Sequence, residues 1–420
     1  MNYHQLDKDL IWHPYTQEKN ATENIVINRG EGAYVIDENG RRLFDACSSW
    51  WTNTHGHAHP YLAEKLYQQA KELEHVIFAG YTHKPAIELA SKLKTYLPEN
   101  QQKFFFSDNG STAVETALKM AFQFWFNQGE KRTKIIALEN AYHGDTFGSM
   151  SISSRGLFTD PFKPLLFDII TIPIQEQFNQ DFFDSFLKEH TEIAAFIYEP
   201  LVQGAAGINI YSATWLDEVL QIFKQNNILL IADEVMTGFG RTGKMFASDY
   251  MNTKPDIMCF SKGLTAGMLP LGLTSATQKI YDAFYNDDKT KTFFHGHSFT
   301  GNPLGCAVAL ASLELFELEN TLTKIEMIEN SHQQFSTKLA RHTKVFNIQQ
   351  QGTILRFEVK TEQGTSYLNE LKASIIRYYL GNNLMIRPLG NVVYFMPPYC
   401  SSADDLEKLY QSSEAFLDSI

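Results

Sequence analysis

Two side chains near the middle of the sequence, Asp233 and Lys262, have the types and spacing needed for amine chemistry. Asp233 ends the apolar run 228–232, and Lys262 follows the shorter apolar run "DIMCFS". Because ligands of open α/β sheets bind at the carboxyl ends of the strands, we expect both side chains at one edge of a sheet. A carboxylate there needs a cationic partner, and the protonated ring nitrogen of pyridoxal 5′-phosphate is one. The same cofactor needs a lysine for its Schiff base, which Lys262 can supply.

This cofactor also needs a phosphate cradle and a flat group over its ring. Gly110 and Ser111 follow the strand-like "KFFFSD" and lead into a helix that we expect to open with Thr112 and Glu115 as a capping box. A helix N-terminus binds phosphate through its free N–H groups, although an ordinary capped helix has the same pattern. Tyr142 follows the apolar "KIIAL" in a loop and can stack on a pyridine ring, although a core tyrosine is an equal alternative.

A glycine-rich stretch, residues 238–243, offers a competing interpretation. It spells G-F-G-R-T-G, which fits the G-x-G-x-x-G pattern of dinucleotide-binding loops. In those loops the glycines open a helix, and an acid follows about 20 residues later. Here the acids, Asp233 and Glu234, precede the glycines, and the following "KMFASDYMNTKPD" has poor helical periodicity. The sequence therefore favours a loop after a strand over a nicotinamide site.

The composition of the 420-residue chain restricts its partners and location. A formal net charge of −12 argues against a general nucleic-acid binder, which normally has a basic face. No run of about 18 apolar residues occurs, and the N-terminal stretch lacks the pattern of a secretion signal. The four cysteines lie far apart, as is common in a reducing compartment. We therefore expect a cytoplasmic protein that binds small molecules, without nucleic acid or membrane partners.

Three histidines in "HGHAHP", His55, His57 and His59, raise the possibility of a metal site. Their i, i+2, i+4 spacing is a weak signal because no acids or cysteines cluster with them. The cysteines form no C-x-x-C pair either. The sequence therefore favours ordinary loop histidines, and no metal is predicted.

The elements that would position these residues follow from the pattern of the chain. Residues 59–315 alternate helical patterns with short apolar runs, which is typical of a mostly parallel sheet covered by helices. Residues 24–46 look like short strands joined by a turn at Asn39-Gly40, and strands return over 345–400. Two helical patterns lie between, over 303–341. We expect an α/β protein in which residues 59–315 form a large domain, and both chain ends, 1–58 and 316–420, form a small α+β domain.

The order of these motifs resembles a known family. Asp233-Glu234, the glycine loop and Ser261-Lys262-Gly263 resemble the signature of the class III pyridoxal-phosphate aminotransferases, and the resemblance covers essentially the whole chain. It implies fold type I, with a mostly parallel, seven-stranded type of sheet in the large domain. A non-catalytic regulator of the same fold would be expected to lack the lysine or the acid. The resemblance implies these roles: Lys262 binds pyridoxal 5′-phosphate, Asp233 pairs with its ring nitrogen, Gly110 and Ser111 hold its phosphate, and Tyr142 covers its ring.

The resemblance also implies a homodimer with shared active sites. In this family a loop of the second subunit completes the phosphate site, which would involve His297 and Ser298 here. The family commonly has Pro-Thr where this chain has His297-Ser298. Serine keeps the hydroxyl group, whereas His297 is either an extra phosphate donor or, as we favour, an ordinary loop residue.

Further stretches resemble the branch of the family that serves biotin synthesis, namely "WHPYTQ", "SSWW", "AYHGDTFG", "HGHSFTGNP" and "IRPLGNVVYFMPP". This branch implies 8-amino-7-oxononanoate as amino acceptor and S-adenosylmethionine as donor. Lysine as donor, or another ω-aminotransferase activity, is the alternative. The resemblance implies ping-pong transamination in which Lys262 moves the proton.

The same resemblance implies a set of substrate residues. Arg387 would bind the distal carboxylate of the keto substrate, because a guanidinium binds a carboxylate in bidentate fashion. Tyr15, Trp50 and Tyr394 would line the pocket together with Tyr142, Gly296 and Lys262, and Tyr15 would also act with Lys262 and Asp233 in catalysis. The alternatives from the residues alone are a core position for Trp50 and a surface salt bridge for Arg387.

Overall fold

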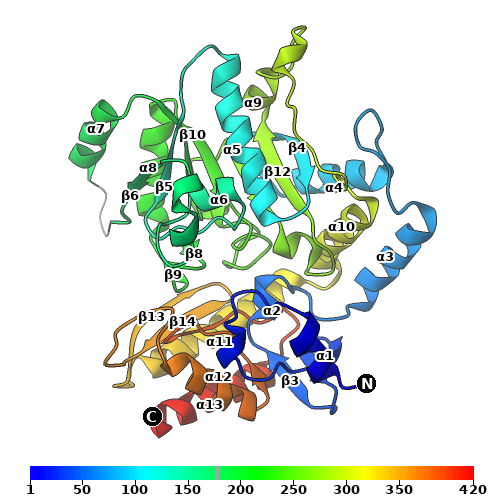
Figure 1. The fold of residues 1–420 in the computed structure, drawn as a ribbon, viewed down its shortest axis with the longest axis vertical. Helices are drawn as coiled ribbons and strands as arrows, with labels where there is room; N and C mark the ends of the chain where they lie inside the picture. Colours follow the sequence, from blue (N-terminus) through cyan, green and yellow to red (C-terminus); the bar gives the residue numbers. More distant parts are fainter. Residues whose placement is uncertain (176–178) are drawn as a thin grey trace.

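The computed structural model describes residues 1–175 and 179–420. Figure 1 shows a larger body that holds the long strands of the central sheet, and a smaller body below it that contains both chain termini. The blue N-terminal segments and the orange and red C-terminal segments lie together in the smaller body. The exact boundaries of 1–58, 59–315 and 316–420 stay predictions, and α10 (Pro303–Leu318) runs across the second of them.

A seven-stranded sheet forms the centre of the larger body. Its strands, in spatial order, are β4 (Gln101–Ser107), β12 (Gly272–Thr277), β11 (Ile257–Phe260), β10 (Leu229–Asp233), β7 (Ile193–Tyr198), β5 (Lys134–Leu138) and β6 (Ile170–Ile172). β12 runs antiparallel to both of its neighbours, and the pairs from β11 to β6 are parallel. The mostly parallel, seven-stranded sheet expected from the sequence is therefore confirmed, with one reversed strand that was not anticipated.

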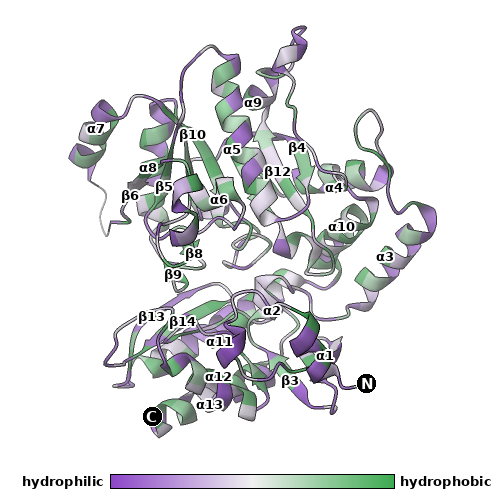
Figure 2. Cartoon of the chain, in the orientation of Figure 1, coloured by the Kyte–Doolittle hydropathy of each residue, from purple (hydrophilic) through white to green (hydrophobic). Residues whose placement is uncertain are grey.

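The strands β7, β10 and β11 are apolar almost throughout because helices cover both faces of the sheet. Leu229 and Ile231 of β10 pack in one core with α5 (Gly110–Asn127), whereas Leu230 and Ala232 pack in a second core with α8 (Ala213–Gln225). Successive side chains of a strand point to opposite faces, so burial on both sides requires an unbroken apolar run. Figure 2 shows this contrast, with green strands at the centre of the sheet near β10 and a largely purple outer helix α1 (Tyr3–Leu10). A further helix of the smaller body is α11 (Thr321–Leu339).

Smaller sheets build the second body, and one of them joins the two chain ends. Its order is β1 (Ile27–Glu31), β2 (Tyr34–Asp37), β3 (Arg42–Asp45) and β15 (Leu384–Met385). The expected turn lies between β2 and β3, where Gly40 has a φ of 81°. β15 pairs in parallel with β3, so a C-terminal strand completes an N-terminal sheet. The other small sheets are β13 (Val345–Gln351), β14 (Ile354–Val359) and β16 (Val392–Phe395), and the hairpin β8 (Val202–Gln203) and β9 (Asn209–Ile210).

The remaining helices connect and cover these sheets. The α-helices are α2 (Ser48–Trp51), α3 (Pro60–Glu72), α4 (Lys84–Lys94), α6 (Phe147–Ser151), α7 (Gln180–Glu189), α9 (Gln278–Asp282), α12 (Leu371–Gly381) and α13 (Ala403–Ser419). The 3₁₀ turns are η1 (Glu18–Asn20), η2 (Asp160–Leu165), η3 (Ala247–Tyr250), η4 (Lys262–Thr265) and η5 (Lys289–Lys291). Among the helices in the described ranges, none has the length and apolar character that crossing a membrane requires.

Candidate active site

A cavity of about 660 Å³ lies at the carboxyl edge of the large sheet. Its lining comes from the segments that follow β4, β5, β7, β10 and β11, together with Trp51 and Thr52 from the N-terminal part. Asp233 is the last residue of β10, and Lys262 lies two positions after β11. The structure therefore brings both side chains to one cavity, as strand topology leads us to expect.

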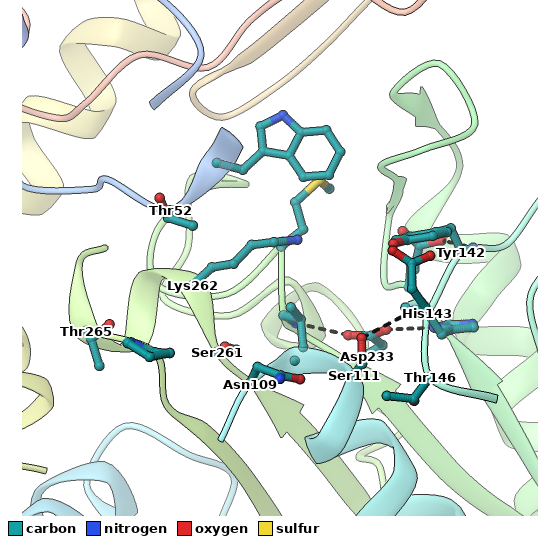
Figure 3. Close-up of a pocket in the computed structure, with 18 of the residues that line it drawn as sticks. Thr52, Asn109, Ser111, Tyr142, His143, Thr146, Asp233, Ser261, Lys262 and Thr265 are labelled. Carbon is teal, nitrogen blue, oxygen red and sulfur yellow. Dashed lines mark hydrogen bonds and ion pairs between the residues drawn. The ribbon is translucent and has the colours of Figure 1, made fainter. Parts of the chain in front are cut away.

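Asp233 is held by His143, which directly follows Tyr142 in the chain and to which the sequence alone assigned no role. Nδ1 of His143 lies 2.7 Å from Oδ2 of Asp233, and the two side chains are 0% and 6% exposed. Oδ1 of Asp233 accepts a hydrogen bond from the Val235 N–H at 3.1 Å (Figure 3). Nε2 of His143 is buried and has no hydrogen-bond partner in the described chain. The contact fixes the direction in which the Asp233 carboxylate faces the cavity.

Lys262 extends into the cavity toward the side where Tyr142, His143 and Asp233 lie (Figure 3). Nζ of Lys262 lies 4.8 Å from the ring centroid of Trp51, and it has no hydrogen bond or ion pair with any residue that the structure describes. Burial lowers the pKa of Lys262, while the charges of Asp233 and Glu199 oppose that shift. A lysine with a lowered pKa is more often a neutral amine, which is the nucleophilic form.

The N-terminus of α5 forms one wall of the cavity, but its cap differs from the expected one. Asn109, rather than Thr112, is the N-cap. Its side chain accepts a hydrogen bond from the Thr112 N–H, and the Thr112 hydroxyl oxygen accepts one from the Asn109 N–H. The expected box of Thr112 and Glu115 is wrong, because an asparagine one turn earlier takes the capping position. An α-helix offers no internal partner to the N–H groups of its first turn, and those of Gly110 and Ser111 have no other hydrogen-bond partner among the described residues.

Glu115 has another task in the structure. Its Oε1 accepts hydrogen bonds from the Thr146 hydroxyl at 2.6 Å, the Gly148 N–H at 2.7 Å and the Ser149 N–H at 3.2 Å. Thr146 ends the loop that carries Tyr142, and Gly148 and Ser149 lie at the start of α6, the helix that follows this loop. Through these hydrogen bonds, Glu115 connects the segment after Tyr142, the expected ring-covering residue, to α5, whose N-terminus is the expected phosphate cradle.

Tyr142 borders the cavity together with two groups from distant parts of the chain. Its hydroxyl lies 3.2 Å from the hydroxyl of Tyr15, which in turn donates to Oδ2 of Asp145 at 2.5 Å. Its backbone N–H donates to Oε1 of Glu199 at 3.0 Å. Burial and the Asp145 hydrogen bond raise the pKa of Tyr15 to about 12, so this phenol stays protonated at neutral pH.

Glu199 was not found from the sequence, although it directly follows the apolar strand β7. It is buried against the cavity, and Oε2 accepts from the Gly204 N–H at 2.8 Å. Burial raises the pKa of Glu199 to about 7, and the neighbouring Asp233 adds to this shift while His143 opposes it. The signal that could have identified Glu199 from the sequence is its position at the end of an apolar strand.

The tryptophan pair lies on α2, a short turn with an unusual backbone. Ser48, Ser49, Trp50 and Trp51 all have positive φ, between 44° and 72°. Each non-glycine residue in this left-handed region costs roughly 1–2 kcal/mol, so surrounding contacts must hold the turn. The indole N–H of Trp51 donates to the Tyr394 hydroxyl at 2.9 Å. Tyr394 is only 1% exposed, so the structure places it behind Trp51 and not in the cavity lining.

Arg387 lies over Trp50, with 4.0 Å between its guanidinium carbon and the ring centroid. The ring centroids of Tyr15 and Trp50 lie 5.5 Å apart. Arg387 is half-buried and forms no hydrogen bond or ion pair with the described residues, so the salt-bridge alternative is not realised. Trp50, with 36% of its surface exposed, is not a core residue. These three side chains adjoin the cavity through Tyr142 and Trp51.

The loop that carries Gly296, His297 and Ser298 does not line the cavity of its own chain. Nδ1 of His297 lies 2.6 Å from Oδ2 of Asp108, just before the N-cap of α5. Gly296 and Ser298 are exposed. The structure of the single chain thus brings this loop close to the helix N-terminus but leaves its serine outside the site.

The two competing patterns have other uses in the structure. The glycine loop 238–243 forms turns and leads into the short 3₁₀ turn η3, not into a helix that could hold a pyrophosphate. The three histidines of "HGHAHP" bind different partners: His55 the carbonyl of Ser312, His57 the carboxylate of Asp45, and His59 that of Glu319. Within the described residues, no three metal-ligating side chains converge on one point.

Comparison with known proteins agrees with this geometry. The family model described as aminotransferase class-III matches residues 15–417. An adenosylmethionine-8-amino-7-oxononanoate aminotransferase of Synechococcus elongatus is 44% identical, covering 98% of this chain and 99% of its own length. The crystal structure of a protein of that name from Methanocaldococcus jannaschii has a TM-score of 0.93 at 36% identity, with 98% of each chain covered. An omega transaminase of Pseudomonas jessenii, solved in complex with PMP, has a TM-score of 0.92 at 27% identity, covering 100% of this chain and 98% of its own.

The family match spans nearly the whole chain, and it includes every strand end that contributes to the cavity. The buried lysine, the oriented carboxylate and the free helix N-terminus lie inside the matched range. This chain therefore belongs to the class III aminotransferases.

Proposed function

We propose that this aminotransferase transfers an amino group from S-adenosylmethionine to 8-amino-7-oxononanoate and forms 7,8-diaminononanoate, a step of biotin synthesis. The observation that carries the proposal is the similarity over nearly full length to relatives that bear the corresponding name, at up to 44% identity. The proposal includes a cytoplasmic location and a division into the domains 1–58, 59–315 and 316–420.

Pyridoxal 5′-phosphate is the cofactor that the cavity fits. The free N–H groups of Gly110 and Ser111 suit its phosphate, because a helix N-terminus attracts anions. Gly110 must remain a glycine there, since a Cβ atom would lie 2.7 Å from Cγ1 of Val235. Tyr142 and Val235 both line the cavity and offer an aromatic and an aliphatic surface for a flat ring. When bound, the cofactor supplies an electron sink for the carbon that loses its proton.

Side chains of the protein would then hold and transfer the protons of the reaction. Asp233, oriented by His143, would pair with the ring nitrogen and keep it protonated. Lys262 would bind the cofactor covalently and, as a free amine, take up and return the proton at Nζ, a task that its lowered pKa favours. Tyr15 and Tyr142 would close the site from the side of Asp145. These roles define Lys262, Asp233 and Tyr15 as the catalytic candidates.

The acceptor side would be formed by Arg387 and its aromatic neighbours. Arg387 has no carboxylate partner among the described residues, so its guanidinium is available for the distal carboxylate of the keto acid. Trp50 would supply apolar surface for the aliphatic chain, and Tyr394 would act through the hydrogen bond that it accepts from Trp51. Glu199 and the Tyr142 loop would complete the opposite wall.

We also propose a homodimer in which this loop reaches the partner subunit's active site, with His297 and Ser298 at the phosphate and Gly296 at the substrate. Ser298 is exposed in a single chain, and Phe294 and Phe299 beside it are 79% and 62% exposed. Large exposed aromatic side chains are typical of surfaces that bind another protein. Co-expression of Lys262→Ala and Ser298→Asp chains tests this, because hybrids would contain one intact site. Activity that stays at the level of either variant alone would contradict the shared site.

The reaction is tested with purified protein, 8-amino-7-oxononanoate and one donor at a time, with 7,8-diaminononanoate detected by mass spectrometry. We expect product with S-adenosylmethionine; product with lysine alone would assign the alternative donor. The Lys262→Ala variant should give no product, whereas Lys254→Ala, which removes a half-buried lysine outside the cavity, should retain activity. Failure with both donors, combined with turnover of simple ω-amino acids, would favour the second candidate, a general ω-aminotransferase, which the likeness to the Pseudomonas enzyme supports.

A further inference from the structure

The left-handed turn that carries the two tryptophans needs an external support. Four successive residues, Ser48 to Trp51, have φ values of 49°, 44°, 70° and 72°. None of them is glycine, and non-glycine residues enter this region singly, not in runs. Such a backbone persists only where the surroundings over-determine it, and such sites are often functional.

The support comes from a buried carboxylate at the end of β3. Asp45 is 0% exposed, and its Oδ2 accepts hydrogen bonds from Nε2 of His57 and from the Ser49 hydroxyl, both at 2.8 Å. Its Oδ1 accepts from the Cys47 N–H at 3.2 Å. Both oxygens of Asp45 thus bind groups within or beside the turn, and a buried, fully hydrogen-bonded network of this kind is rigid.

His57 is itself fixed in place. Its N–H donates to the Gly32 carbonyl at 2.7 Å, and its carbonyl accepts from the Gly32 N–H at 3.2 Å. Its Nδ1 lies 3.1 Å from Nδ2 of Asn53. His57 therefore connects the carboxylate of Asp45 to a backbone position outside the turn.

The turn directs its two indoles to different parts of the site. Trp51 lies over Nζ of Lys262 at 4.8 Å, on the cavity side. Trp50 lies under Arg387 at 4.0 Å and against Tyr15, on the side proposed for the acceptor. In an ordinary right-handed or extended backbone these two neighbouring side chains would point elsewhere. The backbone conformation is therefore what places both contacts.

We propose that Asp45 and His57 are positioning residues, which lock the turn Ser48–Trp51 in its left-handed form and so place Trp50 and Trp51 for acceptor binding. The part about the acceptor rests on the proposed function, whereas the part about the lock does not. The His57 of "HGHAHP" thereby has a use that is neither a metal site nor an ordinary loop position. Neither residue touches the reacting atoms.

The lock is tested by fluorine NMR of the holoenzyme labelled with fluorotryptophan. The chain has five tryptophans, and single Trp→Phe variants assign their signals. His57→Ala should shift or broaden the signals of Trp50 and Trp51 and leave those of the other three unchanged. His57→Gln should restore them, because its amide N–H can donate to Asp45 in place of the imidazole.

A matched control is available in the same motif. His59 also pairs with a carboxylate, that of Glu319 at 2.9 Å, and the side chains of His59 and His57 are both 13% exposed. His59→Ala should leave the Trp50 and Trp51 signals in place. If His57→Ala does not fold, Ser49→Ala serves instead, since Ser49 is exposed and loses only its bond to Asp45. Unmoved Trp50 and Trp51 signals in the folded variant, or equal changes with His59→Ala, would overturn the lock.

Kinetics then test the acceptor part. His57→Ala should lower kcat/KM for the amino acceptor by about 10- to 100-fold, mainly through KM, because misplaced binding groups cost this much. His57→Gln should recover most of that loss, and His59→Ala should stay near the parent. Shifted tryptophan signals with unchanged acceptor kinetics would overturn the positioning role. If the unmodified enzyme does not use 8-amino-7-oxononanoate, the proposed function fails, and the fluorine result still decides the lock.

Discussion

Replacing Arg387 by alanine tests the substrate assignment most directly. Its guanidinium is half-buried over Trp50 and has no anionic partner among the described residues. The distal carboxylate of the substrate would therefore be the first anion to bind it. A hydrogen-bonded contact to a charged group contributes about 1.5–3 kcal/mol. Because water reaches this guanidinium, we expect a loss near 2 kcal/mol, or roughly 30-fold in kcat/KM for the keto acid. Arg387→Lys should recover only part of it, since an ammonium cannot form the bidentate contact.

Single-turnover measurements separate the two halves of the reaction. The donor lacks a distal carboxylate, so its half-reaction should change much less than the acceptor half-reaction in the Arg387→Ala variant. Arg377→Ala is a suitable control, because this exposed arginine on α12 has no ion pair among the described residues. Equal losses in both half-reactions, or no loss in either, would refute the assignment of Arg387 to the distal carboxylate.

Three other predictions concern the buried groups of the cavity. Lys262→Ala should fold normally yet lose the absorbance of the covalently bound cofactor and its turnover; a borohydride-reducible cofactor on this variant would be inconsistent with the role. Asp233→Asn should bind the cofactor but slow both half-reactions by about 100-fold or more, because a neutral amide cannot keep the ring nitrogen protonated; near-normal rates would argue against it. Glu199 has a pKa raised from 4.5 to about 7, so its contribution to stability is present below pH 4.5 and is lost as the pH rises to 7. Glu199→Gln should remove up to about 3 kcal/mol of this pH dependence in urea unfolding, and an unchanged slope would contradict the shift.

The strand ends that form the site could be predicted because burial on both faces leaves a clear signal. Strand β10 is apolar up to its last residue, Asp233, and strand β11 is apolar throughout, with Lys262 two positions after its end. β12 could not be predicted, since Gly272–Thr277 reads "GLTSAT" and has few large apolar residues. Its burial comes from its position between β4 and β11, which the local sequence does not encode.

The partners of the functional residues could not be predicted. His143 and Asp233 are 90 positions apart, and their contact depends on how the loop after β5 folds over the end of β10. Local patterns identify the element that carries a residue, but not the side chain that faces it across the sheet. The same limit applies to Asp45 and His57, whose contact is visible only once the backbone of the turn between them is known.

The glycine loop shows how a familiar pattern can serve packing instead of nucleotide binding. Gly240 has a φ of 93°, and a Cβ atom there would lie 2.4 Å from Cδ1 of Ile325 on α11. The loop therefore packs against the smaller body at a position where only glycine, which has no side chain, fits. This approach buries Arg241, which donates hydrogen bonds to the carbonyls of Pro397 at 3.0 Å and Trp51 at 3.4 Å. The loop is the next part of the chain after β10, which ends in Asp233, with residues 234–237 between them. One continuous segment thus joins the carboxylate proposed for the cofactor to the turn proposed for the acceptor, which couples the positions of the two sides of the site.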